Sequence, residues 1–273
     1  MKVLIVGDIV GNPGREILKA YLERKRKDYD LVIVNGENSA AGFGITGKLA
    51  DQLFDWGCDV ITGGNHIWDK KEFYDYLDKT DKVLRPANYP EGVPGRGYTI
   101  VKDKNGNKIG VISLQGRVFM PPIDCPFKKA KELIEEIRKE TKIIIIDFHA
   151  EATSEKIAMG WHLDGYISVI YGTHTHIQTA DNKILPEGTG YITDVGMTGS
   201  DNGVIGMSVE SILPKFLNAL PQRFEIAEGN ERLNGIEVEI DIEVNENMQE
   251  YKKRVKLDGD DFIYTEYLRM CNF

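Results

Sequence analysis

The most informative stretch of this chain is Ile170-Tyr171-Gly172-Thr173-His174-Thr175-His176. The apolar run Tyr166 to Tyr171 predicts a buried strand, so His174 and His176 are expected in the loop past its carboxyl end. Glycine allows a tight turn there, and two neighbouring imidazoles can both be offered to a metal ion. Alone, the pair is equally compatible with two polar residues on an exposed loop.

Short β-branched runs alternate with segments of helical period along the chain, which is typical of sheets covered by helices. The predicted strands are 2–6, 30–34, 60–62, 98–102, 108–114, 142–146 and 191–193. The predicted helices are 15–27, 48–56, 70–77, 128–139 and 209–218, with 11–14 as a loop. Asn105-Gly106 predicts a hairpin turn. Segments 235–244 and 251–257 alternate apolar and charged residues, which predicts an antiparallel pair at a sheet edge.

Length, charge and hydropathy limit the class of protein. The 273 residues show no repeat and no linker rich in Pro or Ser, so we expect a single domain over 1–273. The net charge of -9 argues against general nucleic-acid binding and against an anionic membrane surface. No apolar run approaches the roughly 20 residues of a membrane span, and Asp8 comes too early for a signal peptide. We therefore expect a cytoplasmic protein.

Metal-capable side chains follow five of the predicted strands, at the points where those strands end. In open α/β sheets the carboxyl ends of strands are where sites assemble, so we expect these side chains to meet. Four of the five histidines fall at these junctions, and the fifth, His162, is expected to be an ordinary polar residue. The junction residues are Asp8, Glu37, Asn38, Asn65, His66, His149, His174 and His176.

This set of side chains fits a pair of metal ions and an anionic substrate. Two carboxylates, two amides and three imidazoles fill about four protein positions on each of two ions if one carboxylate bridges them. Two divalent ions bring four positive charges, and the carboxylates of Asp8 and Glu37 neutralise two of them. About two units of positive charge therefore remain to bind a hydroxide and an anion. A phosphoester is the substrate class that fits such a centre.

The order of these motifs resembles the calcineurin-like metallophosphoesterase superfamily, whose fold is a four-layer α/β/β/α sandwich. Five longer motifs are similar to those of the bacterial YmdB-like phosphodiesterases, and the resemblance runs from the first strand to about Gly206. The motifs are Gly7-Asp8-Ile9-Val10-Gly11, Asn35-Gly36-Glu37-Asn38-Ser39, Gly64-Asn65-His66-Ile67-Trp68-Asp69, the run from Asp147 to Lys156, and the run from Thr193 to Gly199.

The resemblance implies a dinuclear site with iron or manganese as the usual metals. It implies that one metal is held by Asp8, Glu37, Asn38 and His176, with Glu37 bridging, and that the second is completed by Asn65, His149 and His174. It also implies that His66 binds no metal and stands beside the phosphate as proton donor. Val10 departs from the wider superfamily, which carries histidine there. Asn38 is the nearest candidate to replace it, and a harder oxygen ligand favours manganese or iron over zinc.

The activity implied by the resemblance is hydrolysis of phosphodiesters, notably of 2',3'-cyclic nucleotides to 3'-phosphates. The expected substrate is therefore a small cyclic nucleotide or another phosphodiester. A hydroxide bridging the two ions would attack phosphorus in line, and His66 would protonate the leaving ribose oxygen. Two alternatives stay open, namely a phosphomonoesterase or RNA-end phosphoesterase that uses the same site, and a non-catalytic regulator that keeps the fold.

Some roles stay open at the level of sequence. Asp69 either orients His66 or caps a surface helix, and Arg117 either meets a phosphate or a neighbouring subunit. Glu151, Ser154 and Glu155 either support the ligands or start a helix. An aromatic residue that stacks on a base would come from Phe43, Trp68 and Phe119, unless these belong to the core. A homo-oligomer is possible, with the C-terminal edge strands as its pairing surface.

Overall fold

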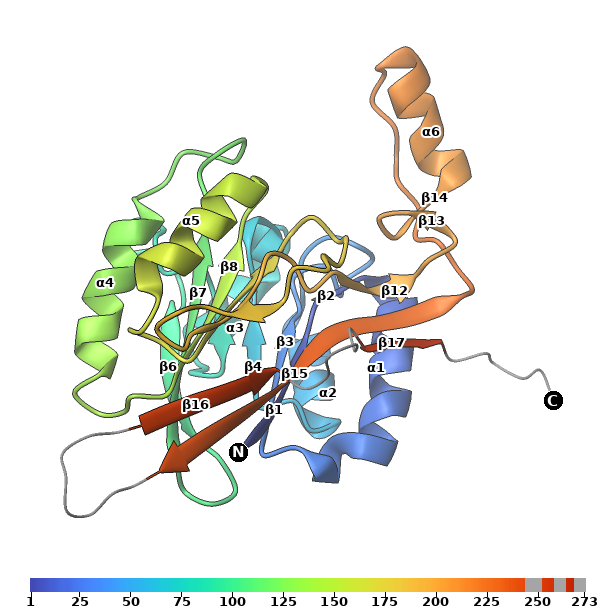
Figure 1. The fold of residues 1–273 in the computed structure, drawn as a ribbon. Coiled ribbons are helices and arrows are strands. Elements are labelled where there is room, and N and C mark those ends of the chain that lie inside the picture. The colour runs from blue at the N-terminus through green and yellow to red at the C-terminus, as the bar shows by residue number, and fades with distance from the viewer. Residues whose placement is uncertain (244–251, 258–263, 268–273) are drawn as a thin grey trace.

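Two sheets pack face to face, and helices cover the outer face of each, in the computed structural model of this chain (Figure 1). The model describes residues 1–243, 252–257 and 264–267. The predicted four-layer α/β/β/α sandwich is confirmed. The three apolar clusters of the sandwich lie between helices and sheet, between the two sheets, and between sheet and helices again.

The first sheet combines parallel strands from the N-terminal half with antiparallel strands from the C-terminal end, in the order β2-β12-β15-β1-β3-β4-β5. Its strands are β1 (Lys2–Val6), β2 (Asp8–Ile9), β3 (Leu31–Asn35), β4 (Val60–Thr62), β5 (Val83–Leu84), β12 (Met197–Ser200) and β15 (Glu231–Glu243). Two further strands, β16 (Lys252–Leu257) and β17 (Tyr264–Tyr267), pair with β15.

Strand β15 lies inside this sheet, so the prediction of an edge position for 235–244 is wrong. Its antiparallel pairing with 252–257 is confirmed, but β15 also pairs with β1 over residues 235–239 and with β12 at its start. The physical reason is burial: Ile236, Val238 and Ile240 pack into the apolar layer between the two sheets. The alternation of charged residues had suggested a half-exposed strand.

The second sheet has the order β10-β11-β9-β8-β7-β6. Its strands are β6 (Tyr98–Lys102), β7 (Lys108–Gln115), β8 (Ile144–His149), β9 (Val169–Thr173), β10 (Lys183–Ile184) and β11 (Gly190–Ile192). The predicted hairpin is confirmed, since Lys102 pairs with Lys108 across the Asn105-Gly106 turn. A separate small ribbon joins β13 (Gly203–Val204) and β14 (Met207–Ser208).

Strands β8 and β9 end further along the chain than predicted. Pairing of β8 with its parallel neighbours β7 and β9 continues through His149, which is opposite Thr173 in β9. His149 is therefore the last residue of a central strand and fully buried, whereas Tyr166, at the predicted start of the next strand, is half exposed. A ligand on a paired strand is held more rigidly than one in a loop.

The helices cover the two outer faces. They are α1 (Gly11–Lys25), α2 (Gly47–Asp55) and α3 (Tyr74–Leu77) on the first sheet, and α4 (Pro126–Ile137) and α5 (Thr153–Leu163) on the second. Three 3-10 turns are η1 (Arg26–Asp28), η2 (Asn65–Trp68) and η3 (Lys71–Phe73). Among these described helices and α6, none is both long and apolar enough to span a bilayer.

Helix α1 starts at Gly11, so the predicted loop over 11–14 is wrong. Pro13 is tolerated because the first turn of a helix needs no backbone N–H donors. Helix α6 (Val209–Asn218) stands away from the body of the sandwich in Figure 1. It carries strongly exposed apolar side chains, with Phe216 at 73% and Leu217 at 77% exposure.

Neighbouring residues of the central strands serve different layers of the core. In β8, Ile145 packs between the sheets, whereas Ile144 and Ile146 pack under helices α4 and α5. A strand that is buried on both faces has an uninterrupted apolar run rather than an alternating one. This is why the isoleucine run of β8 marks the centre of a sheet.

Replacing Ile145 by alanine tests the layer between the two sheets. Ile145→Ala is expected to lower the free energy of unfolding by about 2–5 kcal/mol, because it leaves a cavity in a close-packed core. The control is Ile157→Ala on α5, where the side chain is 38% exposed and the expected loss is below about 1 kcal/mol. Urea unfolding of both variants checks this, and equal losses would contradict the proposed packing.

Candidate active site

The structure brings all eight predicted site residues to one end of the sandwich. Asp8 follows β1, Glu37 and Asn38 follow β3, and η2 begins with Asn65 and His66 directly after β4. His149 ends β8, and the two histidines of the His-x-His motif follow β9. Parallel strands of both sheets end here, so side chains distant in sequence meet in one cluster.

Four ligand atoms converge on one point at the centre of this cluster. The Nε2 atom of His149 lies 2.9 Å from Glu37 Oε1, 3.1 Å from Asn65 Oδ1 and 3.0 Å from His174 Nδ1. Glu37, His149 and His174 can offer ligand atoms that all lie within 4.8 Å of one another. Lone pairs at such distances repel each other unless a proton or a metal ion lies between them, so this is a candidate metal site.

Hydrogen bonds orient His149 toward that point. The Thr173 hydroxyl donates to Asp147 Oδ1 at 2.7 Å, so it accepts from His149 Nδ1 at 2.9 Å. The other nitrogen, Nε2, then faces the cluster. Partners of this kind, which fix the tautomer of a ligating histidine, are typical of protein metal sites.

Glu151 orients the ring of His174 and fixes its tautomer. The Oε2 atom of Glu151 lies 3.2 Å from His174 Nε2, and because a carboxylate accepts, this nitrogen carries the proton. The Nδ1 lone pair of His174 is then directed at His149. Of the three residues left open at the start of α5, Glu151 supports a ligand and Ser154 is exposed, whereas buried Glu155 accepts from the backbone of residues 117 and 118.

A second group of ligand atoms adjoins the first. The Oδ1 atoms of Asp8 and Asn38 are buried and accept no hydrogen bond within the described part of the chain. Asn38 donates its amide to Gly42 O, and His176 donates Nδ1–H to Ile205 O at 3.0 Å. His176 Nε2 is therefore free, 3.9 Å from Asp8 Oδ1. Buried acceptors without donors are the expected state of ligands that bind a cation, so these residues fit a metal ion.

The electrostatics of the cluster favour a positive charge at its centre. Burial alone would raise the pKa of Glu37, but the neighbouring His149 lowers it to about 2. Burial would lower the pKa of His149, but the Glu37 carboxylate outweighs this and raises it to about 9. Burial and the charge of His149 lower the pKa of His174 to about 3. The charged Glu37 carboxylate thus favours a cation beside it, whether this is the His149 imidazolium or a bound metal ion.

The loop that carries His174 and His176 is held in a strained conformation. Their φ angles are 96° and 66°, in the left-handed region that non-glycine residues rarely adopt. Behind this loop, the buried ammonium of Lys156 lies 2.6 Å from Asp194 Oδ2 and donates to Thr173 O. Asp194 also accepts from the backbone and the hydroxyl of Thr175. The buried ion pair therefore fixes the loop from both ends.

Lys156, Asp194, Asp147 and Thr173 were not predicted as functional residues. The sequence did contain a signal, because three of them lie in the motifs shared with the family, at Asp147, Lys156 and Asp194. Their partners, however, come from other strands and could not be read from the local sequence. They hold His149 and the loop of His174 and His176 in place.

His66 lies at the edge of the cluster. Its backbone N–H donates to Glu37 Oε2 at 3.1 Å, as does that of Gly64, and these bonds direct Oε1 toward His149. Its ring Nδ1 lies 2.9 Å from Asp69 Oδ2, so the orienting role for Asp69 is the one that the geometry supports. The Nε2 atom of His66 is left for a substrate.

A cavity of about 300 Å³ opens over the cluster. It is lined by Glu37, Asn38, Gly42, Phe43, His66, Glu151, His174, Thr175, His176, Ile205, Met207, Ile212 and Phe224. Of the three aromatic residues considered for stacking on a base, Phe43 lines this cavity. Trp68 packs against Tyr74 and Tyr89 instead. The Arg117 guanidinium instead lies 3.4 Å from Cys125 Sγ.

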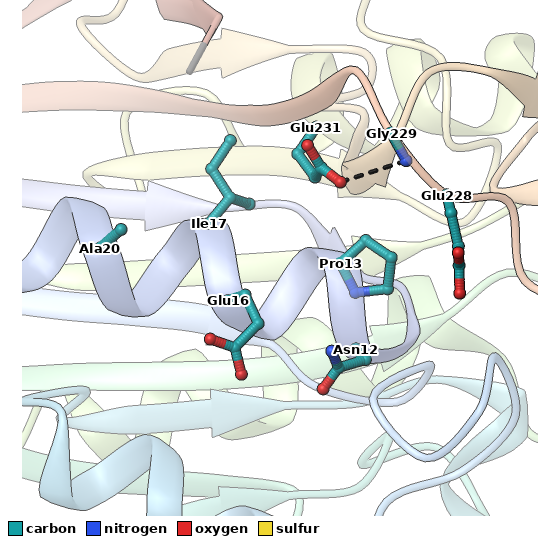
Figure 2. Close-up of a pocket in the computed structure, with 8 residues that line it drawn as sticks. All are labelled: Asn12, Pro13, Glu16, Ile17, Ala20, Glu228, Gly229 and Glu231. Atoms are coloured by element: carbon teal, nitrogen blue, oxygen red, sulfur yellow. Dashed lines mark hydrogen bonds between the residues drawn. The ribbon is translucent and has the colours of Figure 1, made fainter. Parts of the chain in front are cut away.

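A larger cavity of about 400 Å³ lies elsewhere, along the outer face of α1 (Figure 2). Its lining includes the carboxylates of Glu16, Glu228 and Glu231 but no imidazole, and Glu231 accepts from the backbone of Gly229. None of the eight predicted residues lines this cavity. The candidate active site is therefore the smaller cavity, where the ligand atoms converge.

The fold and this cluster define a metallophosphoesterase-type hydrolase. A family model described as "YmdB-like protein" matches residues 4–253 of the chain. The chain belongs to the YmdB-like family.

Three relatives support this assignment. The 2',3'-cyclic-nucleotide 2'-phosphodiesterase of Bacillus subtilis is 51% identical over 97% of this chain and 100% of its own. The crystal structure of a hypothetical protein from Thermus thermophilus has a TM-score of 0.84 and 39% identity, and covers 95% of this chain and 100% of that one. The structure of a novel phosphatase from Mycoplasma pneumoniae has a TM-score of 0.82 and 35% identity, with 94% of each chain covered. These relatives confirm the prediction of an enzyme of the hydrolase class.

Loss of a ligand histidine tests the metal site. His174→Ala is expected to lower metal affinity by at least about 10-fold, because even a residue that only supports a ligand contributes that much. The matched control is His162→Ala, since His162 packs against Phe127 on the outer helices. Metal content after dialysis, measured by mass spectrometry, checks this. Equal metal retention in both variants would contradict the site.

The buried ion pair behind the histidine loop is expected to contribute strongly to stability. Asp194→Asn should lower the free energy of unfolding by about 3–5 kcal/mol, because it leaves the Lys156 charge buried without a counter-ion. The control is Asp201→Asn, whose partly exposed pair with Arg232 should contribute at most about 1 kcal/mol. Urea unfolding checks both variants, and a loss for Asp194→Asn no larger than the control's would rule out this role.

Proposed function

We propose that this chain is a dinuclear-metal phosphodiesterase that hydrolyses 2',3'-cyclic nucleotides to 3'-phosphates. The single observation that carries the proposal is the convergence of Glu37, His149 and His174 on one point. The orphaned buried oxygens of Asp8 and Asn38 beside it support a second ion. The name of the Bacillus subtilis relative supports the substrate class, since cleavage of the 2' bond leaves a 3'-phosphate.

Two sets of residues would hold the ions. Asn65, His149 and His174 would hold one, and Asp8, Asn38 and His176 the other, with Glu37 between them. Carboxylate and amide oxygens together with imidazoles suit iron or manganese. When bound, the ions supply Lewis-acid chemistry, activating a water as nucleophile and neutralising charge on the phosphoryl oxygens.

His66 would supply the proton to the leaving oxygen. Asp69 accepts from its Nδ1, so the ring presents Nε2 to the cavity in a fixed orientation. The ring that donates is the imidazolium, with a proton on each nitrogen. When Nε2 gives its proton to the departing ribose oxygen, the ring becomes neutral and keeps its Nδ1–H bond to Asp69. Glu37 does not compete for that proton, because the backbone N–H groups of Gly64 and His66 already hold its outer oxygen.

The other expectations stay predictions. We propose a single domain over 1–273, because the strands of the first sheet come from both ends of the chain. The cytoplasmic location and the homo-oligomer also stay predictions. Because β15 lies inside its sheet, the pairing surface of a homo-oligomer would have to come from β16, which pairs with β15.

Replacing His66 separates proton donation from metal binding. His66→Ala is expected to keep its metal and lose about 10²–10⁴ in kcat on 2',3'-cyclic AMP, the usual contribution of a general acid. Metal content and turnover are measured on the same sample. A variant that loses metal in proportion to activity would place His66 among the ligands instead.

The same assay distinguishes the alternative functions. At one metal concentration, the wild type should hydrolyse 2',3'-cyclic AMP with higher kcat/KM than 3',5'-cyclic AMP, p-nitrophenyl phosphate or a short RNA with a terminal phosphate. Preference for either of the last two would replace the proposal by the phosphomonoesterase or RNA-end hypothesis. Metal-loaded protein without activity on any of them would favour the non-catalytic regulator.

A further inference from the structure

One wall of the active-site cavity is apolar, and the proposed reaction does not use it. This wall is formed by the side chains of Phe43, Met207, Ile212 and Phe224. The rest of the lining includes Glu37, His174 and His176. Phe43 comes from the loop after β3, whereas the other three come from β14, α6 and the segment after α6, so two distant parts of the chain build the wall.

The wall is backed by packed side chains. Met207 and Ile212 form a buried cluster with Val10 and Met197, and the rings of Phe43 and Phe224 pack against it. The two rings stack with centroids 6.4 Å apart and planes at 29°. Both rings are only half-buried, so part of their apolar surface faces the cavity.

Phe43 also touches the proposed proton donor. Its ring centroid lies 5.1 Å from that of His66, with the rings edge to face. In a 2',3'-cyclic nucleotide, the 2'-oxygen is bonded to the carbon next to the one that carries the base. If the 2'-oxygen leaves toward His66, the base lies in the part of the cavity next to His66. The apolar wall reaches that part through Phe43, which contacts His66.

We propose that this wall is the subsite for the nucleobase, with Phe43 as its stacking residue. The proposal rests on the function proposed above and names the part of the substrate that the metal ligands do not touch. Aromatic side chains bind bases by stacking, which every base permits because each has a flat π face. The wall therefore places the 2'-oxygen, rather than the 3'-oxygen, beside the proton donor.

The composition of the wall also sets its selectivity. Phenylalanine, methionine and isoleucine side chains offer no strong hydrogen-bond donor or acceptor, so they cannot read the edge of a base. We expect kcat/KM for the adenine, guanine, cytosine and uracil 2',3'-cyclic nucleotides to agree within about 10-fold. A cavity of about 300 Å³ is at the lower end of small-molecule sites, which suits a mononucleotide.

The decisive experiment removes the stacking ring and the base separately. The substrates are 2',3'-cyclic AMP and the baseless analogue 1-O-methylribose 2',3'-cyclic phosphate. Phe43→Ala should raise KM for 2',3'-cyclic AMP by about 10-fold, the contribution of one stacked base, and leave KM for the baseless analogue unchanged. Phe43→Leu, which keeps an apolar side chain against Met207, should fall between the wild type and Phe43→Ala.

Phe119→Ala is the matched control. Phe119 is 89% exposed, does not line the cavity, and was the other open candidate for stacking. It should leave KM for both substrates unchanged. Metal content of all variants is measured alongside.

The outcomes are distinct. If Phe43→Ala changes KM for both substrates equally, or if only Phe119→Ala raises KM for 2',3'-cyclic AMP, the wall is not the base subsite. If the wild type has the same KM for both substrates, the base has no subsite. If the metal-loaded wild type hydrolyses neither, the failure belongs to the proposed function and not to the assignment of the wall.

Discussion

The Nε2 atom of His149 lies close to Glu37, Asn65 and His174, and the surrounding structure must stabilise this arrangement. A fully buried carboxylate and imidazole are costly unless they are paired and hydrogen-bonded. Here Glu37 and His149 are paired with each other. The backbone N–H groups of residues 64 and 66 donate to the other oxygen of Glu37, and His149 Nδ1 donates to Thr173, so Oε1 and Nε2 face one spot. A cation at that spot would offset the cost. The Glu37 carboxylate and the His149 imidazole favour each other's charged forms, which is why the pKa of Glu37 is lowered and that of His149 is raised.

The rest of the sandwich keeps this arrangement rigid. The apolar layer between the sheets packs β3 against β8 and β9. This packing keeps the turn that carries Glu37 at a fixed distance from His149 and His174. Polar bonds cross the same gap, because the Asn35 amide donates to Asp147, which also accepts from Thr173. The Lys156–Asp194 pair holds the histidine loop from behind. A site held in this way is preorganised, so little reorganisation is needed when metal and substrate bind.

The cavity has a polar surface and an apolar surface. Its polar side presents ligand atoms and the oriented ring of His66, which deal with the phosphate. Its apolar side is built on a small separate cluster around Met207, at the base of the protruding helix α6. The two sides meet where Phe43 contacts His66. In the proposed function, this contact would couple the chemistry at phosphorus to the placement of the nucleoside.

Local sequence was enough to predict the longer strands of the sandwich and the residues at their ends, but not short strands such as β2, β5, β10 and β12. Apolar runs and the polar residues that follow them are short-range features, and parallel strands place their carboxyl ends at one edge whatever the details of packing. Asp8, Glu37 and His149 could therefore be named in advance. Long-range pairing could not be predicted in this way. The inner position of β15, the Lys156–Asp194 pair and the meeting of Phe43 with Phe224 depend on burial between segments far apart in the chain, which no local pattern records.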